Sequence, residues 1–93
     1  MERTKGKRGR KAYTLEERII GVEICERVQE VREKNGMSQG AFADKLGLGH
    51  ATICDWETQD KVPMLIPLVR VCKTFGVSLD WLVFGKETDN EKV

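Results

Sequence analysis

Residues 38–59, SQGAFADKLGLGHATICDWETQ, decide the fold. Ala43 is small enough to lie where two short helices cross. Gly47 follows Leu46, where the first of these helices must stop, and glycine accepts the positive φ that such a stop requires. Ile53 is expected to turn back from the second helix onto Ala43. The pattern therefore predicts two helices joined by a tight turn, the helix-turn-helix unit.

Helical spacing of apolar residues defines the inward faces of this unit. These residues are Phe42, Leu46 and Trp56. We expect the first helix to span residues 39–46, with Ser38 as its N-cap, and the second to span residues 50–58.

One helix is predicted before the unit. Thr14 and Glu17 have the spacing of a capping box, and the helix that they start should run to about Asn35, with Gly36 following it. Gly21 lies in its interior, where glycine costs about 1 kcal/mol relative to alanine. We therefore expect a break or kink at Gly21, with residues 15–20 as a separate short helix. Its apolar stripes are Leu15, Ile19 and Val22, and Ile24, Val28 and Val31.

Two helices are predicted after the unit. Pro63 should open a helix that runs to Phe75, and Ser78 should cap a last helix that ends before Gly85. The chain is thus predicted to be all-α. We expect a flexible basic arm over residues 1–13, a helix-turn-helix domain over 14–85 and a polar tail over 86–93.

Composition limits the class of protein. A chain of 93 residues that is 40% hydrophobic and 33% charged supports one small helical domain. No apolar run approaches the ~20 residues of a membrane span, and the N-terminus lacks the apolar core of a secretory signal. We therefore expect a cytoplasmic protein without membrane contact. Met1 and the polar end fit a complete small protein, although the DNA-binding part of a longer repressor would look the same.

Charge is distributed unevenly, although the net charge is only +1. Residues 1–11 contain six Lys or Arg and one Glu, whereas residues 38–60 carry a net charge of −3. The basic arm is expected to follow nucleic-acid phosphates, and Arg8 and Arg10, separated by a glycine, are narrow enough to enter a minor groove. The alternative is a solubilising tail.

Several short motifs together resemble the phage repressor and Cro-type family of bacterial regulators. They are Arg27-Val28-x-x-Val31-Arg32-Glu33, Gly36-Met37-Ser38-Gln39, Phe42-Ala43-x-x-Leu46-Gly47, Thr52-Ile53-x-x-Trp56-Glu57, Pro63 and Phe75-Gly76-Val77-Ser78-Leu79-Asp80-Trp81-Leu82. They cover about residues 24–85. The resemblance implies the five-helix, lambda-repressor-like DNA-binding fold, a role in transcription regulation and a homodimer on a two-fold operator of double-stranded DNA.

The resemblance also implies roles for individual residues. The DNA-binding candidates are Gln39 and Gly49 at phosphates, His50, Ala51, Thr52 and Asp55 toward the major groove, and in addition Lys61. Arg32 and Glu57 match a structural ion pair that orients the recognition helix. Three positions depart from the family pattern: Gly49 stands where relatives usually have Ser or Thr, Gln59 where they usually have Gly, and Gly40 where they often have a helix former.

Other interpretations of the same residues remain open at this stage. Asp55 could accept a hydrogen bond from cytosine N4 or be a solvated side chain, and it repels phosphates. His50 and Cys54 are four residues apart, but two ligands do not complete a zinc site. We expect no metal or cofactor. With one histidine and no phosphate-binding loop, we also expect no enzyme activity. Cys25, Cys54 and Cys72 form no CxxC motif, which predicts reduced, buried thiols.

Two hypotheses for function follow. The first is a sequence-specific, dimeric DNA-binding regulator, in particular a repressor, that reads the major groove with residues 50–58. The second is a protein-interaction or dimerisation module on the same fold, such as an adaptor or antirepressor. Some of the last apolar residues, Trp81, Val83 and Phe84, are expected to belong to the core and some to a two-fold contact.

Overall fold

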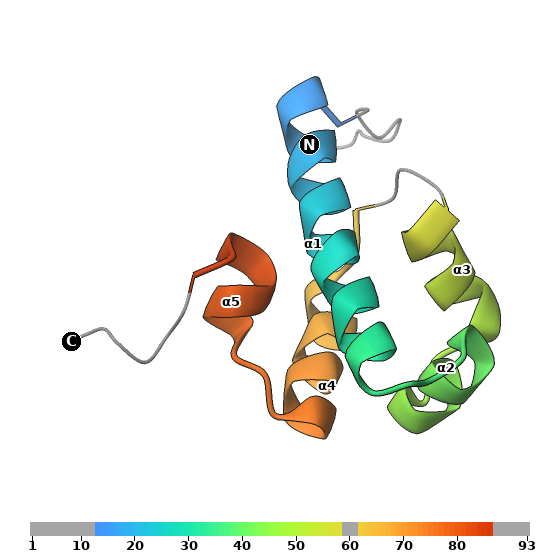
Figure 1. The fold of residues 1–93 in the computed structure, drawn as a ribbon. Helices are drawn as coiled ribbons and strands as arrows, with labels where there is room; N and C mark the ends of the chain where they lie inside the picture. Colours follow the sequence, from blue (N-terminus) through green and yellow to red (C-terminus); the bar gives the residue numbers. More distant parts are fainter. Residues whose placement is uncertain (1–12, 59–61, 87–93) are drawn as a thin grey trace, which may run out of the picture.

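The computed structural model describes residues 13–58 and 62–86. In these ranges the chain forms five α-helices and no strand, which confirms the predicted all-α fold (Figure 1). The helices are α1 (Leu15–Lys34), α2 (Gln39–Leu46), α3 (His50–Thr58), α4 (Leu65–Phe75) and α5 (Leu79–Phe84). The predictions for Arg8, Arg10, Gln59 and Lys61 lie outside the described residues, as do most of the predicted arm and tail.

The first helix begins where the capping box predicted. Thr14 N donates to Glu17 Oε1 at 2.9 Å, and Glu17 N donates to Thr14 Oγ1 at 3.1 Å. The predicted break at Gly21 is wrong, because α1 is continuous over 20 residues and Gly21 is buried within it. The intrinsic cost of one glycine is small compared with the packing of the buried residues that follow it in the same helix.

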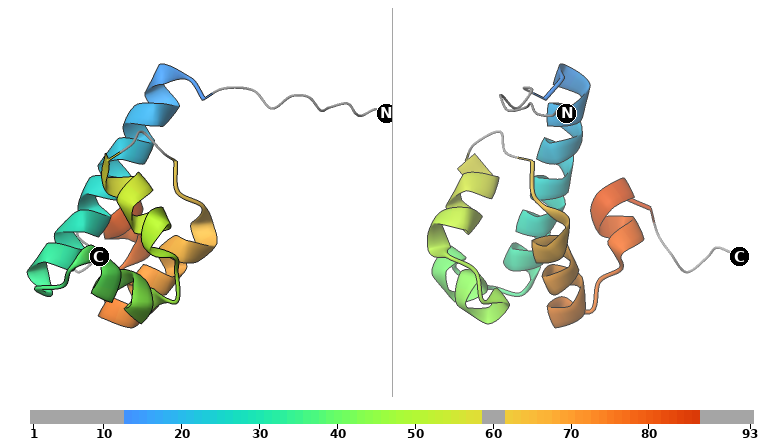
Figure 2. Two further views of the ribbon diagram at one scale, coloured as in Figure 1. Left: turned by 90° about the vertical axis from the view of Figure 1, so that its right-hand side faces the viewer. Right: turned by 180° about the vertical axis from the view of Figure 1, so that it is seen from behind.

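The first two turns of α1 extend beyond the rest of the helical bundle (Figure 2). Leu15 is 75% exposed and Ile19 50% exposed, so the first apolar stripe of this helix faces solvent. The second stripe, by contrast, enters the core through Ile24, Val28 and Val31. Helical spacing alone does not distinguish the two stripes, because both have the same period.

A Schellman motif forms the corner between α2 and α3. Gly47 has φ 71°, Leu48 N donates to Ala43 O at 2.9 Å, and Gly47 N donates to Asp44 O at 3.1 Å. Ala43 and Ile53 are both buried, as the helix-turn-helix prediction requires. The corner therefore fixes the direction of α3 relative to α2.

The core lies between all five helices. Phe42 on α2 stacks on Phe75 on α4, with ring centroids 5.2 Å apart. The buried apolar side chains are Ile24, Cys25, Val28, Val31, Phe42, Ala43, Leu46, Ile53, Trp56, Leu68, Val71 and Leu82. The sequence prediction had placed most of these inside, including Trp56.

The fourth helix begins two residues later than predicted. Met64, rather than a residue at the proline, is the N-cap of α4, with extended backbone (φ −82°, ψ 160°) and no side-chain cap. Pro63 thus precedes the helix, whereas Pro67 lies in its first turn, where a missing N–H costs nothing. Ser78 caps α5 as expected, because its Oγ accepts from Trp81 N at 3.0 Å.

Candidate nucleic-acid interface

The third helix has one buried face and one face turned outward. Ile53 and Trp56 pack into the core. On the other side, His50 and Ala51 are exposed and Thr52 and Asp55 are half-buried. We call His50, Ala51, Thr52 and Asp55 the reading face. It contains every residue of α3 that the sequence assigned to the major groove.

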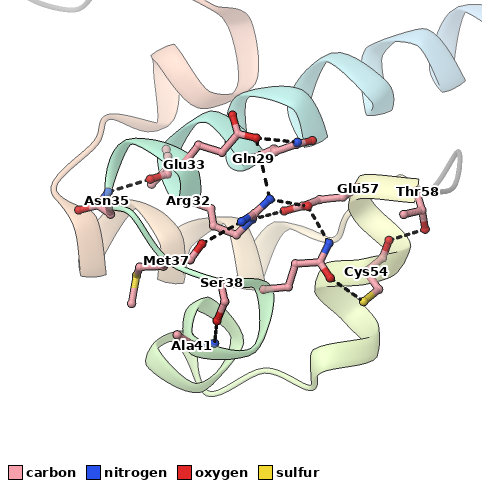
Figure 3. A network of polar contacts seen from close by, with 12 residues as sticks. Gln29, Arg32, Glu33, Asn35, Met37, Ser38, Ala41, Cys54, Glu57 and Thr58 are labelled. Carbon is pink, nitrogen blue, oxygen red and sulfur yellow. Dashed lines mark hydrogen bonds and ion pairs between the residues drawn. The ribbon is translucent and has the colours of Figure 1, made fainter.

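An ion pair connects α1 to the C-terminal end of α3 (Figure 3). Arg32 Nε lies 2.7 Å from Glu57 Oε2, and Arg32 Nη2 donates to Glu57 Oε1 at 2.9 Å, so the contact is bidentate. Only 15% of the Arg32 side chain and 5% of the Glu57 side chain are exposed. The hydrogen-bonded carboxylate raises the pKa of Arg32. The two hydrogen bonds hold the end of α3 in place against α1.

The same carboxylate reaches the second helix. Gln39 Nε2 donates to Glu57 Oε1 at 2.8 Å, and Cys54 Sγ lies 3.0 Å from Gln39 Oε1 (Figure 3). Because an ionised carboxylate only accepts and a thiol donates, the two contacts favour the same orientation of the amide. The Gln39 side chain, assigned to a phosphate from sequence, is thus held within the protein, with one amide hydrogen left after the bond to Glu57.

This role of Cys54 was not predicted from the sequence. The four-residue spacing from His50 made Cys54 a weak metal candidate, whereas its thiol faces α2 and bonds to Gln39. The one available signal was the i, i+3 spacing of Cys54 and Glu57, which puts them on the same side of a helix. That spacing does not reveal which residue of α2 lies opposite them.

Backbone N–H groups gather at the N-termini of α2 and α3. Ser38 Oγ accepts from Ala41 N at 3.1 Å, and Gly49 O accepts from Thr52 N at 3.1 Å. The first N–H groups of a helix have no acceptor within that helix, and its dipole favours an anion there. Gln39 and Gly49 therefore lie at helix ends suited to phosphate oxygens.

The charge of α3 is less favourable for DNA. Its sequence, HATICDWET, contains no Lys or Arg. Its two acids differ in setting, because Glu57 is paired with Arg32 while Asp55 lies on the reading face. The side chains of α3 therefore offer no positive charge to a phosphate.

Two features typical of other classes of protein are missing from the part of the chain that the structure describes. The described residues hold no group of three His, Cys, Asp or Glu side chains that could bind a metal ion. None of their helices is both long and apolar enough to cross a bilayer. None of the three cysteines, which all lie in the described ranges, forms a disulfide. Only Cys25 is buried, so the expectation of buried thiols was wrong for Cys54 and Cys72.

These features together define a helix-turn-helix protein of the repressor type. A family model described as "Helix-turn-helix" matches residues 28–82, which is more than half of the chain. The chain belongs to this family of DNA-binding transcription regulators, which is not a family of enzymes. No solved structure gives a significant match.

Curated relatives carry names that agree with this assignment. An uncharacterized HTH-type transcriptional regulator of Bacillus subtilis, YgzD, is 31% identical over 69% of this chain and 96% of its own length. YobD of the same organism is 25% identical over 74% of this chain. ImmR, also an HTH-type transcriptional regulator of Bacillus subtilis, is 29% identical over 74% of this chain. The chain spans 62% of YobD and 54% of ImmR.

Proposed function

We propose that this protein is a sequence-specific regulator, in particular a repressor, that reads the major groove of double-stranded DNA with α3. The observation that carries the proposal is the separation of faces on this helix. Ile53 and Trp56 anchor α3 in the core, so the reading face is presented outward on a rigid support. Exposed side chains on the outer face of a helix can reach base edges in the major groove.

The N-terminal end of α2 would contact the DNA backbone beside α3. The remaining amide hydrogen of Gln39 and the first-turn N–H groups of α2 supply uncharged donors for a phosphate. Gly49 would add a backbone donor at the start of α3. Because Glu57 is neutralised by Arg32, its carboxylate does not oppose these contacts.

The basic arm would supply the charge that α3 lacks. In this proposal Arg8 and Arg10 enter the minor groove and Lys61 contacts a phosphate; all three lie outside the described residues. The protein would act in the bacterial cytoplasm, associated with the nucleoid, as a homodimer. Two copies of α3 would then occupy half-sites about 34 Å apart, one turn of the duplex.

Fluorescence anisotropy with duplex DNA tests the proposal. Selection from a genomic or random library should return an inverted repeat, and a labelled duplex with that repeat should bind more tightly than a scrambled one. Asp55→Asn should bind scrambled DNA more tightly than wild type, because a negative charge facing phosphates is removed. Asp80→Asn, which makes the same change of charge on the exposed start of α5, should leave the affinity unchanged.

Failure of selection to enrich any sequence, with no anisotropy change at low salt, would contradict the proposal. A second candidate would then be favoured, a protein-interaction module on the same fold. It has its own structural support in apolar residues that face solvent in two helices and immediately before them. They are Tyr13, Leu15, Ile19, Ile20 and Val22 at the start of α1, and Met64, Leu65 and Ile66 at the start of α4.

A further inference from the structure

A hollow of about 310 Å³ lies between α3 and the start of α4. In the left view of Figure 2, the segment that leads into α4 runs beside α3. Thr52 and Asp55 line the hollow and also belong to the reading face. The hollow is therefore continuous with the surface that the proposed function places in the major groove.

Apolar side chains form most of the walls of this hollow. Trp56 is buried in the core, and Leu48 packs against that core. Pro63 and Met64 contribute from the segment before α4, and the ring of Pro63 restricts the backbone there. Met64 is 76% exposed, so its flexible side chain is able to close over an apolar group. Such a group leaves water on entering the hollow, with little ordering of the protein.

Asp55 adds a hydrogen-bond acceptor to this apolar hollow. An ionised carboxylate accepts up to about four hydrogen bonds and donates none. A bond from a base is therefore able to add to the interaction that Asp55 makes within the protein. The hydroxyl of Thr52 both donates and accepts, so it does not select between the two. The hollow consequently favours a ligand that carries an apolar group next to a hydrogen-bond donor.

Pyrimidine bases differ in this combination at their major-groove edges. Thymine has a methyl group at C5, but the neighbouring O4 is an acceptor. Cytosine has a donor, the N4 amino group, but only hydrogen at C5. Both the methyl group and the donor are present in 5-methylcytosine. The carboxylate of Asp55 would repel O4 of thymine, whereas it would accept from N4 of 5-methylcytosine.

We propose that this hollow is a recognition site for 5-methylcytosine in double-stranded DNA. The C5-methyl group enters between Trp56 and Met64, and the N4 amino group donates to Asp55. The inference rests on the proposed function, in which α3 reads the major groove, and it adds a covalent mark on the DNA to the sequence that is read. It also gives a reason for an acidic side chain on the reading face, because the hydrogen bond from the base offsets the repulsion by phosphates.

Selection followed by fluorescence anisotropy tests the site. The full chain selects from two libraries of random duplexes, one made with cytosine and one with 5-methylcytosine throughout. Duplexes of the selected sequence then carry 5-methylcytosine at one cytosine at a time. Burial of the methyl group should raise the affinity about fourfold at one position of the half-site. Unchanged affinity at every position, or selected sequences without cytosine, would overturn the inference.

Two variants show whether the hollow holds the methyl group. Met64→Ala removes part of one wall and should reduce the fourfold gain to less than about twofold. Ile66→Ala is the matched control and should keep the gain, because Ile66 is 64% exposed at the start of α4 but does not line the hollow. An equal gain in the two variants would contradict this placement of the methyl group.

A third variant tests the hydrogen bond to Asp55. A T·A pair in place of the pair between 5-methylcytosine and guanine keeps a methyl group but exchanges the donor for an acceptor. Wild type should bind this duplex at least about fivefold more weakly, as for one mismatched base pair. Asp55→Asn should discriminate by less than about twofold, since an amide both donates and accepts. Full discrimination by Asp55→Asn, or a preference of wild type for the T·A duplex, would exclude the hydrogen bond.

The outcomes separate this inference from the proposed function. Binding of DNA with equal affinity for cytosine and 5-methylcytosine would overturn the recognition site and leave the regulator intact. The hollow would then be open to an apolar side chain of a protein partner. Binding to neither library would contradict the regulator itself.

Discussion

The guanidinium of Arg32 on α1 holds the carboxylate of Glu57 on α3 through two hydrogen bonds of 2.7 and 2.9 Å. A third contact, from Arg32 Nη1 to Met37 O at 2.8 Å, joins the pair to the segment before α2. One side chain therefore links the three elements that set the position of the reading face. This arrangement explains how a helix of nine residues can keep one orientation.

We expect Glu57→Gln to lower the free energy of unfolding by about 3–5 kcal/mol, because it leaves the charge of Arg32 largely buried without its bidentate partner. Urea denaturation followed by circular dichroism measures the change. Glu33→Gln is the matched control: Glu33 also approaches Arg32, at 4.0 Å, but its side chain is 60% exposed, and we expect a change below ~0.5 kcal/mol. Similar losses for the two variants would contradict the central role of Glu57.

Substitution by alanine at two glycines of the helix-turn-helix should change the stability of the fold in opposite directions. Gly40 lies in α2, and an added Cβ would meet nothing within 4 Å, so Gly40→Ala should stabilise the fold by about 0.5–1 kcal/mol. Gly47 has φ 71°, and a Cβ there would lie 3.2 Å from Arg70 Nη1. Gly47→Ala should therefore destabilise it by about 1–2 kcal/mol. Calorimetry of thermal unfolding shows whether each variant is stabilised or destabilised. A change in the same direction for both variants would contradict the role assigned to Gly47 in the turn.

Two isoleucines of α1, one buried and one exposed, allow a controlled comparison. Ile24→Ala should lower the free energy of unfolding by about 2–5 kcal/mol, because Ile24 belongs to the core. Ile19→Ala, on the exposed start of the same helix, should change the free energy of unfolding by less than ~0.5 kcal/mol. Chemical denaturation of the monomer checks both values. A large loss for Ile19→Ala would mean that the projecting end of α1 is covered in solution.

The two arginines that bond to the C-termini of helices should contribute unequally to the free energy of unfolding. Arg27→Lys replaces two bonds of 2.8 Å to α5 carbonyls and should cost about 1.5–3 kcal/mol, since lysine cannot reproduce the bidentate geometry. Arg70 bonds to Leu46 O and Gly47 O at 3.1 and 3.2 Å and is more exposed, so Arg70→Lys should cost less than ~1 kcal/mol. Equilibrium unfolding measures both losses of stability. A larger loss for Arg70→Lys than for Arg27→Lys would contradict this prediction.

Removal of residues 1–11 should reduce the salt dependence of DNA binding. The segment carries six Lys or Arg, and each neutralised phosphate contributes about 0.9 to the slope of log K against log salt. The slope should therefore fall by several units. Anisotropy titrations at a series of salt concentrations measure it, and an unchanged slope would exclude the arm from the interface.

The sequence by itself determined the local structure of this protein. Caps at Thr14, Ser38 and Ser78 and the positive-φ turn at Gly47 act through neighbouring residues, and each appears where the sequence predicted it. The buried positions of Phe42, Ala43, Ile53 and Trp56 were equally predictable, because the helix-turn-helix corner has few ways to close.

The tertiary structure decided what local rules cannot. Gly21 stays helical because the packing around it outweighs the low helix propensity of glycine. The two apolar stripes of α1 have the same helical period, so the period does not show which of them is buried. The bonds from Cys54 to Gln39 and from Arg27 to α5 join residues 15 and 55 or more positions apart. Such contacts depend on how rigid helices meet in space, and that relation is set by the packing of the whole core.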